Sequence, residues 1–161
     1  MPNNATITSC SWNRTHGFVA AGCENGVVKL IKLEMSEGKD AKSSKAPNQS
    51  ALVINETLEG HSGEIATVTW NNKFNKLTTA DSNGKIVVWI NYEGQWCEEM
   101  INKRDNTTIT GMKWSPDGLH ICIIYNDGVI IMGSLEGTRV WVKEIKNVIL
   151  TNIEVKNQFC K

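Results

Sequence analysis

The sequence lacks long apolar runs and lacks an excess of charge of either sign. Its longest apolar stretches are about five residues, far below the ~20 needed to span a bilayer. It has 17 lysine and arginine residues against 17 aspartate and glutamate residues, and no segment concentrates one sign. Basic stripes supply most of the affinity of nucleic-acid binders, so this class is disfavoured. Residues 1–4 lead directly into the first repeat, so we expect no signal peptide and no membrane span.

Metal-binding and catalytic motifs are also missing. The five cysteines are an odd number without C-x-x-C spacing, which is typical of reduced thiols in a cytosolic protein. His16, His61 and His120 do not stand at metal-ligand spacing. The chain has no Gly-rich phosphate loop, no G-x-S-x-G elbow and no convergent carboxylate pair. We therefore expect no catalytic residue, no metal, no cofactor and no small-molecule substrate, and hence no enzyme.

What the sequence does contain is an internal repeat. A tryptophan is followed 14 residues later by a glycine that comes directly after Asn or Asp. The three pairs are Trp12 with Gly26, Trp70 with Gly84, and Trp114 with Gly128. Asn-Gly or Asp-Gly between two apolar runs is the strongest short-range hairpin signal, because the favoured turn needs positive φ. The repeated unit is therefore strand, hairpin, strand.

The spacing of the repeats predicts a β-propeller. Trp70 and Trp114 are 44 residues apart, and Trp12 and Trp70 are 58 apart because a polar stretch at 34–50 is inserted. A fourth strand starts at Trp96 and recurs 45 residues later. A period near 44 with four strands fits a WD-type blade. We predict an all-β fold, a partial propeller of about three four-stranded blades plus the first strand of a fourth.

The same spacing predicts the borders of the blades. They are blade one at 5–58 with an inserted loop at 34–50, blade two at 59–101, blade three at 102–145, and a remnant of blade four at 146–161. The insertion mixes charges with Ser and Pro, so we expect a mobile loop. Val155 stands where the next tryptophan is expected and no turn follows it. We expect the fourth blade to stop after its first strand and the ring to stay open.

Blade two resembles the WD40 repeat family. A Gly-His pair ending at His61 precedes its first strand, and Trp89 closes its third. Members of that family often tie a blade with a polar chain from the His through a strand hydroxyl and a turn Asp to the Trp indole. Here Asn83 holds the turn position nearest that Asp, with Asp81 close by. The resemblance implies a partial polar tie, with apolar packing holding the blades together.

A closer resemblance covers nearly the whole chain. It rests on the strings Ser11-Trp12-Asn13, Leu58-Glu59-Gly60-His61-Ser62-Gly63, Thr69-Trp70-Asn71, Leu77-Thr78-Thr79, Asn83-Gly84-Lys85-Ile86-Val87-Val88-Trp89, Glu98-Glu99-Met100-Ile101-Asn102 and Asp127-Gly128-Val129-Ile130-Ile131. This ordered set resembles the N-terminal propeller of WD-repeat subunits of the retrograde intraflagellar transport complex A. Among these subunits, it is most similar to the one related to the tubby-like WD-repeat protein. Relative to that pattern, we expect the chain to be shortened at both ends.

The resemblance implies a non-enzymatic scaffold without a cofactor. Its implied partners are other WD-repeat and helical-repeat subunits of the transport complex, in the cytoplasm, the cilium or flagellum and the basal body. An alternative is a WD-repeat interaction module of another cytosolic assembly, such as a coat or a ubiquitin-ligase adaptor. A propeller enzyme would need carboxylates or histidines at the same position of successive repeats. The turn positions offer only Asn25, Asn83 and Asp127, which the hairpins explain.

Overall fold

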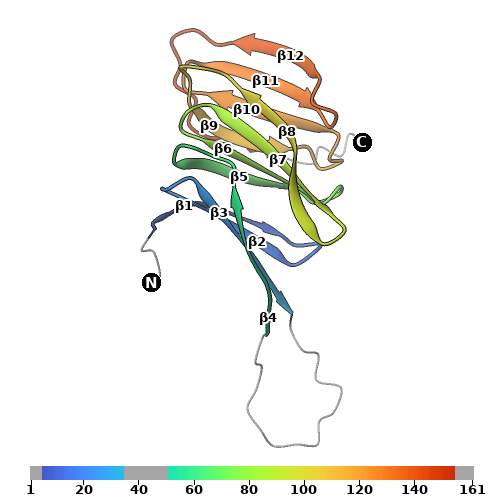
Figure 1. Cartoon of the computed structure of the whole chain (residues 1–161). Helices are drawn as coiled ribbons and strands as arrows, with labels where there is room; N and C mark the ends of the chain where they lie inside the picture. The colour runs from blue at the N-terminus through green and yellow to red at the C-terminus, as the bar shows by residue number, and fades with distance from the viewer. Residues whose placement is uncertain (1–4, 35–50, 155–161) are drawn as a thin grey trace, which may run out of the picture.

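The computed structural model describes residues 5–34 and 51–154, which form strands and no helix (Figure 1). The strands are β1 (Ile7–Asn13), β2 (Phe18–Cys23), β3 (Val27–Glu34), β4 (Ala51–Glu59), β5 (Ile65–Asn71), β6 (Lys76–Asp81), β7 (Lys85–Tyr92), β8 (Gln95–Lys103), β9 (Ile109–Trp114), β10 (His120–Tyr125), β11 (Val129–Ser134) and β12 (Arg139–Glu144). The predicted all-β class is confirmed.

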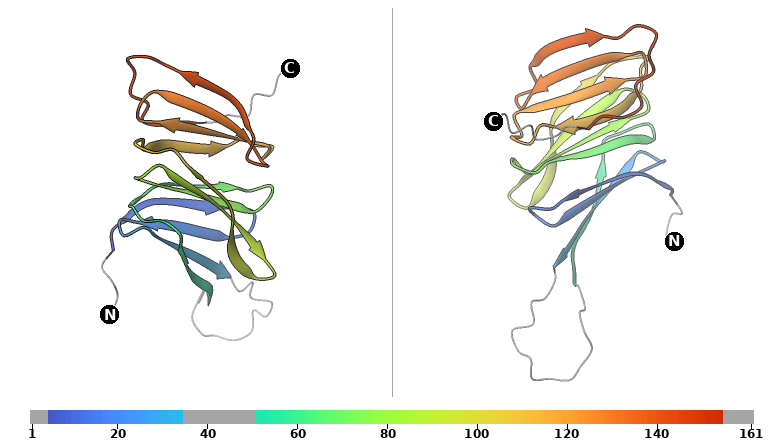
Figure 2. Two further views of the ribbon diagram at one scale, coloured as in Figure 1. Left: turned by 45° about the horizontal axis from the view of Figure 1, so that its top comes forward. Right: turned by 180° about the vertical axis from the view of Figure 1, so that it is seen from behind.

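The strands form three antiparallel sheets of four consecutive strands each. We call them blade one (β1–β4), blade two (β5–β8) and blade three (β9–β12). The sheets stack on one another like layers, with blade two in the middle (Figures 1 and 2). The first strands β1, β5 and β9 are neighbours across the blade boundaries. This is the arrangement expected of consecutive propeller blades.

Burial follows the position of a strand within its blade. In blade two, the middle strands β6 and β7 are buried along most of their length because neighbouring blades cover both of their faces. This explains why their sequences read as continuous runs of apolar and threonine residues without alternation. The last strands β8 and β12 are largely exposed, and β12 is exposed at every residue. They form the outer edge of the blades.

Two apolar clusters hold the blades together, one at each boundary. Between blades one and two, the buried side chains include Leu30 and Leu77. The same boundary carries three aromatic rings, Phe18, Trp70 and Trp96, whose centroids lie 5.5 to 5.9 Å apart. Aromatic pairs at this spacing each add ~0.5–1.5 kcal/mol beyond their buried area. The second boundary is packed mainly by aliphatic residues of blade three.

The chain after β12 differs from the expectation for a fourth blade. Residues 145–154 contain no strand, and 155–161 lie outside the described residues. A first strand in this fold is held by backbone pairing with the second strand of its blade, and no described segment pairs with 146–154. Ile153 instead packs its side chain beside Gly111 and Ile124 of blade three.

The predicted loop at 34–50 falls almost entirely on residues 35–50, outside the described residues. The strands on either side of it are described, and β3 pairs with β4 up to Glu34 opposite Ala51. The insertion therefore leaves the hairpin between the third and fourth strands of blade one intact.

Candidate interaction site

The repeated glycines shape the hairpin turns that end each second strand. Gly26, Gly84 and Gly128 have φ angles of 81°, 77° and 84°. The chain that connects one blade to the next crosses close to each glycine. Arg104 donates its backbone N–H to the carbonyl of Gly84 at 3.1 Å, and Ile145 does the same to Gly128 at 3.0 Å. These positions need glycine for their backbone conformation and for this close approach.

Blade two contains a continuous buried hydrogen-bond chain. Nδ1 of His61 lies 3.0 Å from Oδ2 of Asp81, and Nε2 lies 2.7 Å from the hydroxyl of Thr79. The indole N–H of Trp89 donates to the same hydroxyl at 2.8 Å. The side chains of His61 and Asp81 have no exposed surface. The chain links the segment before β5 to strands β6 and β7.

This arrangement corrects the role given to Asn83. The carboxylate of the polar chain belongs to Asp81, whose second oxygen also accepts the backbone N–H groups of Asn83 and Lys85 at 2.9 and 3.0 Å. Asp81 is the last residue of β6 and points inward, whereas Asn83 lies in the turn and is exposed. The polar tie of blade two is therefore complete.

The environment of His61 favours its neutral form. Burial lowers the pKa of its imidazole, and the hydrogen bond to Asp81 acts in the opposite direction. A neutral ring with the proton on Nδ1 donates to Asp81 and accepts the hydroxyl proton of Thr79. The oxygen of Thr79 is then free to accept the Trp89 N–H. One proton arrangement satisfies the whole chain, which gives these residues a structural use.

The repeated tryptophans connect neighbouring blades. Trp114 donates its indole N–H to the hydroxyl of Thr78 in blade two at 3.0 Å. Trp70 donates to the backbone carbonyl of Ser11 in blade one at 3.1 Å. Blade one has Ala20 at the place of Thr78 in the repeat, so no hydroxyl is available there. In both hydrogen bonds, the tryptophan of one blade donates to the blade that precedes it in the chain.

Trp12 occupies the same repeat position but is 58% exposed. Its ring lies beside the guanidinium of Arg14, 5.6 Å from the ring centroid. No blade in the described part of the chain covers this side of β1, β2 and β3. Half-buried Val19 and Ile31 lie opposite one another on the same face, in register with Trp12. This face therefore has the apolar character of a blade boundary, in which the equivalent Trp70 is buried.

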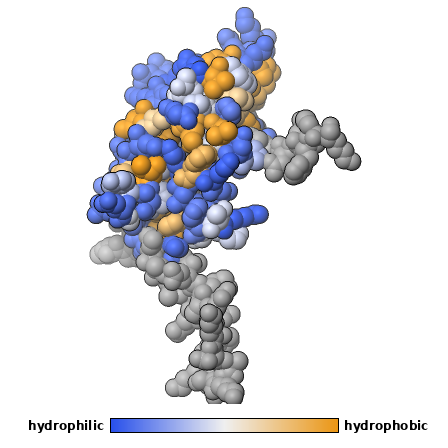
Figure 3. All heavy atoms as spheres, turned by 90° about the vertical axis from the view of Figure 1, so that its right-hand side faces the viewer, coloured by the Kyte–Doolittle hydropathy of each residue, from blue (hydrophilic) through white to orange (hydrophobic). Residues whose placement is uncertain are grey.

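Blade three has an open face at the other end of the stack. Cys122, Met132 and Trp141 lie side by side across β10, β11 and β12, and Trp141 is 41% exposed. Burial raises the pKa of the Cys122 thiol, so it stays protonated at neutral pH. Figure 3 shows one side of the molecule, where apolar residues appear mainly at the height of blades two and three.

Two buried asparagines were not singled out from the sequence. Asn13 and Asn71 each follow a repeat tryptophan and are 0% and 1% exposed. Asn71 donates its side-chain amide to the carbonyl of Gly118 in blade three at 2.8 Å, and Asn13 donates to the side chain of Asn75 in blade two at 2.9 Å. The recurring Trp-Asn pair was the signal that could have identified them.

Within residues 5–34 and 51–154, no cluster of three or more His, Cys, Asp or Glu side chains could hold a metal ion. None of the segments described forms a helix of the length and apolarity that crossing a bilayer requires. The described residues offer strand edges and a cleft between blades two and three, which are features suited to binding other chains.

Similarity to known proteins agrees with the repeat architecture. The family described as WDR35/TULP4 N-terminal matches residues 1–158. The human WD repeat-containing protein 35 is 46% identical over 153 residues, which cover 95% of this chain and 13% of that protein. The human tubby-related protein 4 is 36% identical over 129 residues, covering 80% of this chain and 8% of the relative. The chain thus spans a small part of the length of these relatives.

Solved structures share the fold at low sequence identity. A chain of the mitotic checkpoint complex matches with a TM-score of 0.69 and 17% identity, covering 92% of this chain and 40% of that chain. The U3-55K structure matches with a TM-score of 0.71 and 9% identity, covering 94% and 43%. Three stacked four-stranded blades in a family of WD-repeat propellers constitute a protein-interaction module. The chain belongs to the family of WDR35/TULP4 N-terminal β-propellers.

Proposed function

We propose that this chain is a non-enzymatic scaffold module of the ciliary retrograde intraflagellar transport complex. Its partners are other WD-repeat and helical-repeat subunits of that complex. It acts in the cytoplasm, at the basal body and in the cilium or flagellum, and it uses no cofactor. The proposal includes the division of the module into blades, with borders at 58/59, 101/102 and 145/146.

The observation that carries the proposal is the 46% identity to WD repeat-containing protein 35 across all three blades. The strings that resemble subunits of the transport complex lie on the strands and turns that build those blades. The largely exposed outer strands β8 and β12 support a role in assembly, because the unpaired edge of a sheet can pair with another chain. A module of a coat or a ubiquitin-ligase adaptor would share the fold without these strings.

The proposal is tested by affinity purification from ciliated cells. The tagged protein that contains these blades should enrich WD-repeat and helical-repeat subunits of the transport complex and concentrate at the ciliary base and along the axoneme. Trp12→Lys and Trp141→Lys place a charge on the open faces of blade one and blade three, and loss of subunits with either variant would identify the face used. Lys29→Gln provides a mild control on the blade-one face.

Enrichment of coat or ubiquitin-ligase subunits without ciliary concentration would overturn the ciliary role. It would leave the propeller fold and the protein-binding role in place.

A further inference from the structure

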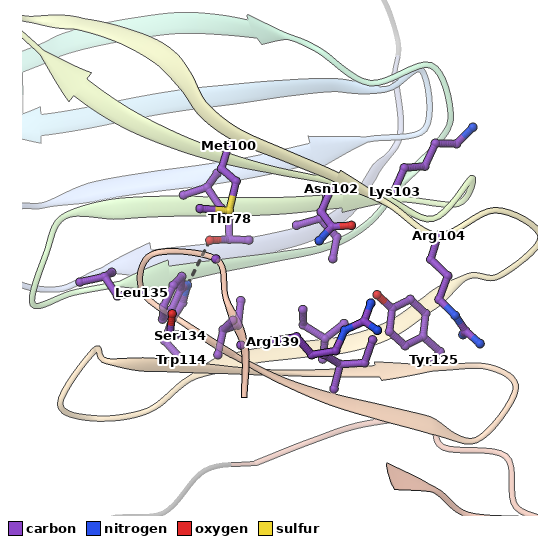
Figure 4. Close-up of a pocket in the computed structure, with 17 residues that line it drawn as sticks. Thr78, Met100, Asn102, Lys103, Arg104, Trp114, Tyr125, Ser134, Leu135 and Arg139 are labelled. Atoms are coloured by element: carbon purple, nitrogen blue, oxygen red, sulfur yellow. Dashed lines mark hydrogen bonds between the residues drawn. The ribbon is translucent and has the colours of Figure 1, made fainter. Parts of the chain in front are cut away.

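A hollow of about 200 Å³ lies between blades two and three, next to the outer strands β8 and β12 (Figure 4). Its apolar walls include Val88 of blade two and Trp114, Ile121 and Ile131 of blade three. Lys103, Arg104 and Arg139 contribute the cationic part of its lining, and Lys103 is paired with Asp105. The corresponding boundary between blades one and two is filled by aromatic rings.

The hollow has a cause in the repeat itself. Trp89 and Gly133 are equivalent, since each stands five residues after the hairpin glycine of its blade. Trp89 is 3% exposed and fills the boundary between blades one and two. Gly133 has no side chain to place in the boundary between blades two and three. The space taken by an indole in one blade is therefore open in the next.

The polar groups at the hollow are incompletely paired. Arg104 forms an ion pair through Nη2 with Oδ2 of Asp127 at 2.7 Å. Its Nη1 is buried and has no hydrogen-bond partner among the described residues. Arg139 forms no ion pair within the described ranges. Figure 4 shows the Arg104 and Arg139 side chains on the two sides of the Tyr125 ring, with the Arg104 guanidinium 4.8 Å from the ring centroid.

Size and charge indicate the class of ligand. Sites for small molecules usually measure ~300–1,000 Å³, so this hollow accommodates one or two side chains. The Arg139 guanidinium, which has no ion-pair partner among the described residues, favours an anion, and Arg pairs best with carboxylate or phosphate. The apolar walls favour an apolar group beside that anion. A short peptide with an acidic residue next to a large apolar residue has both features.

We propose that the hollow between blades two and three binds a peptide segment of a partner protein in which a carboxylate stands beside a large apolar side chain. The apolar side chain enters against Trp114 and Ile131, and the carboxylate pairs with the guanidinium of Arg139. This inference rests on the proposed protein-binding role but is independent of the assembly to which the chain belongs.

The test is a titration followed by NMR of the tryptophan indole N–H signals. The probes are a capped hexapeptide with a central Phe-Glu pair and its Phe-Gln analogue. The Phe-Glu peptide should shift the signal of Trp114, which lines the hollow, and leave that of exposed Trp12 in place. The Phe-Gln peptide should bind about tenfold more weakly, since charged hydrogen bonds are about twice as strong as neutral ones.

Variants separate the hollow from the rest of the surface. Arg139→Gln should weaken binding of the Phe-Glu peptide about tenfold. Lys143→Gln changes the same charge on the same strand, on the opposite face, and should have no effect. Gly133→Leu should abolish binding by filling the hollow; a Cβ there would lie 3.3 Å from Ile121 Cγ2, so only a small adjustment is needed. The signals of Trp70 and Trp89 report that each variant is folded.

Equal affinity for the two peptides, equal losses with Arg139→Gln and Lys143→Gln, or no saturable shift of Trp114 would each overturn the inference. Co-purification of the partner assembly is measured separately. A negative titration with intact co-purification therefore rejects the peptide site alone.

Discussion

The hydroxyl oxygen of Thr79 lies 2.8 Å from the indole nitrogen of Trp89 and accepts its N–H. The same hydroxyl lies 2.7 Å from Nε2 of His61. Strands β6 and β7 and the segment before β5 thus meet at one oxygen atom. Because Thr79 is fully buried, no solvent can replace it as the partner of the other two groups.

Replacing Thr79 by Val keeps the shape of the side chain and removes this oxygen. The buried Trp89 N–H and the His61 Nε2 are then unpaired, so we expect a loss of about 2 kcal/mol in the free energy of unfolding. Chemical denaturation measures it. Thr67→Val is the matched control, since half-buried Thr67 makes no side-chain hydrogen bond in the part of the chain described here, and it should change stability by less than about 0.5 kcal/mol. Equal losses would mean that the polar chain adds no stability.

The stability of the protein should fall as the pH is lowered from about 7 to about 5. Burial lowers the folded-state pKa of His61, so the unfolded chain binds a proton near its ordinary pKa of ~6.5 while the folded protein does not. This contribution to the free energy of unfolding is therefore fully present above the unfolded-state pKa. It is lost as the pH falls from there toward the folded-state pKa, with a slope of up to ~1.4 kcal/mol per pH unit.

His61→Gln isolates this contribution, because glutamine does not titrate. The pH slope between 7 and 5 should be smaller in this variant, as measured by denaturation at each pH. The lowered carboxyl pKa values of Asp117 and Asp127 affect stability only at more acidic pH. An unchanged slope in His61→Gln would show that His61 titrates alike in both states.

Valine should cost more at Gly84 than at Gly94. Both residues have positive φ, at 77° and 87°, so both variants are strained. A Cβ at Gly84 would in addition collide with the carbonyl oxygen of Arg104, whereas no atom lies within 4 Å of a Cβ at Gly94. We expect the Gly84→Val variant to be less stable than Gly94→Val by about 1 kcal/mol or more. Similar denaturation midpoints for the two would contradict the close approach.

Deleting 36–49 should leave the three blades folded. The pairing of β3 with β4 ends at Glu34 and Ala51, so Met35 and Ser50 would remain as a two-residue turn. The entropy of closing a loop depends only weakly on the number of residues in it. We therefore expect the free energy of unfolding to change by less than about 1 kcal/mol. Replacing the pair by Asn-Gly provides a control with a favoured turn. A cooperative loss of stability in both deletion variants would show that the segment packs on the blades.

The hairpins and the four-stranded repeat could be read from the sequence because their causes are local. Positive φ at Gly26, Gly84 and Gly128 depends on the turn itself, and the spacing of Trp70 and Trp114 reflects the length of one blade. The expected strand of a fourth blade does not form within 146–154, because a strand depends on pairing with another segment.

The tertiary structure decided which side chains do what. Asp81 and Asn83 are two residues apart, and only the inward direction of the end of β6 gives the His61 contact to Asp81. Trp70 is 5% exposed because blade one packs against it, whereas Trp12 holds the same repeat position and is 58% exposed because no described blade covers it. Backbone conformation is set by neighbours along the chain, whereas burial and hydrogen-bond partners are set by the blade that packs against it. The hollow beside Gly133 likewise exists because an adjacent blade faces a residue without a side chain.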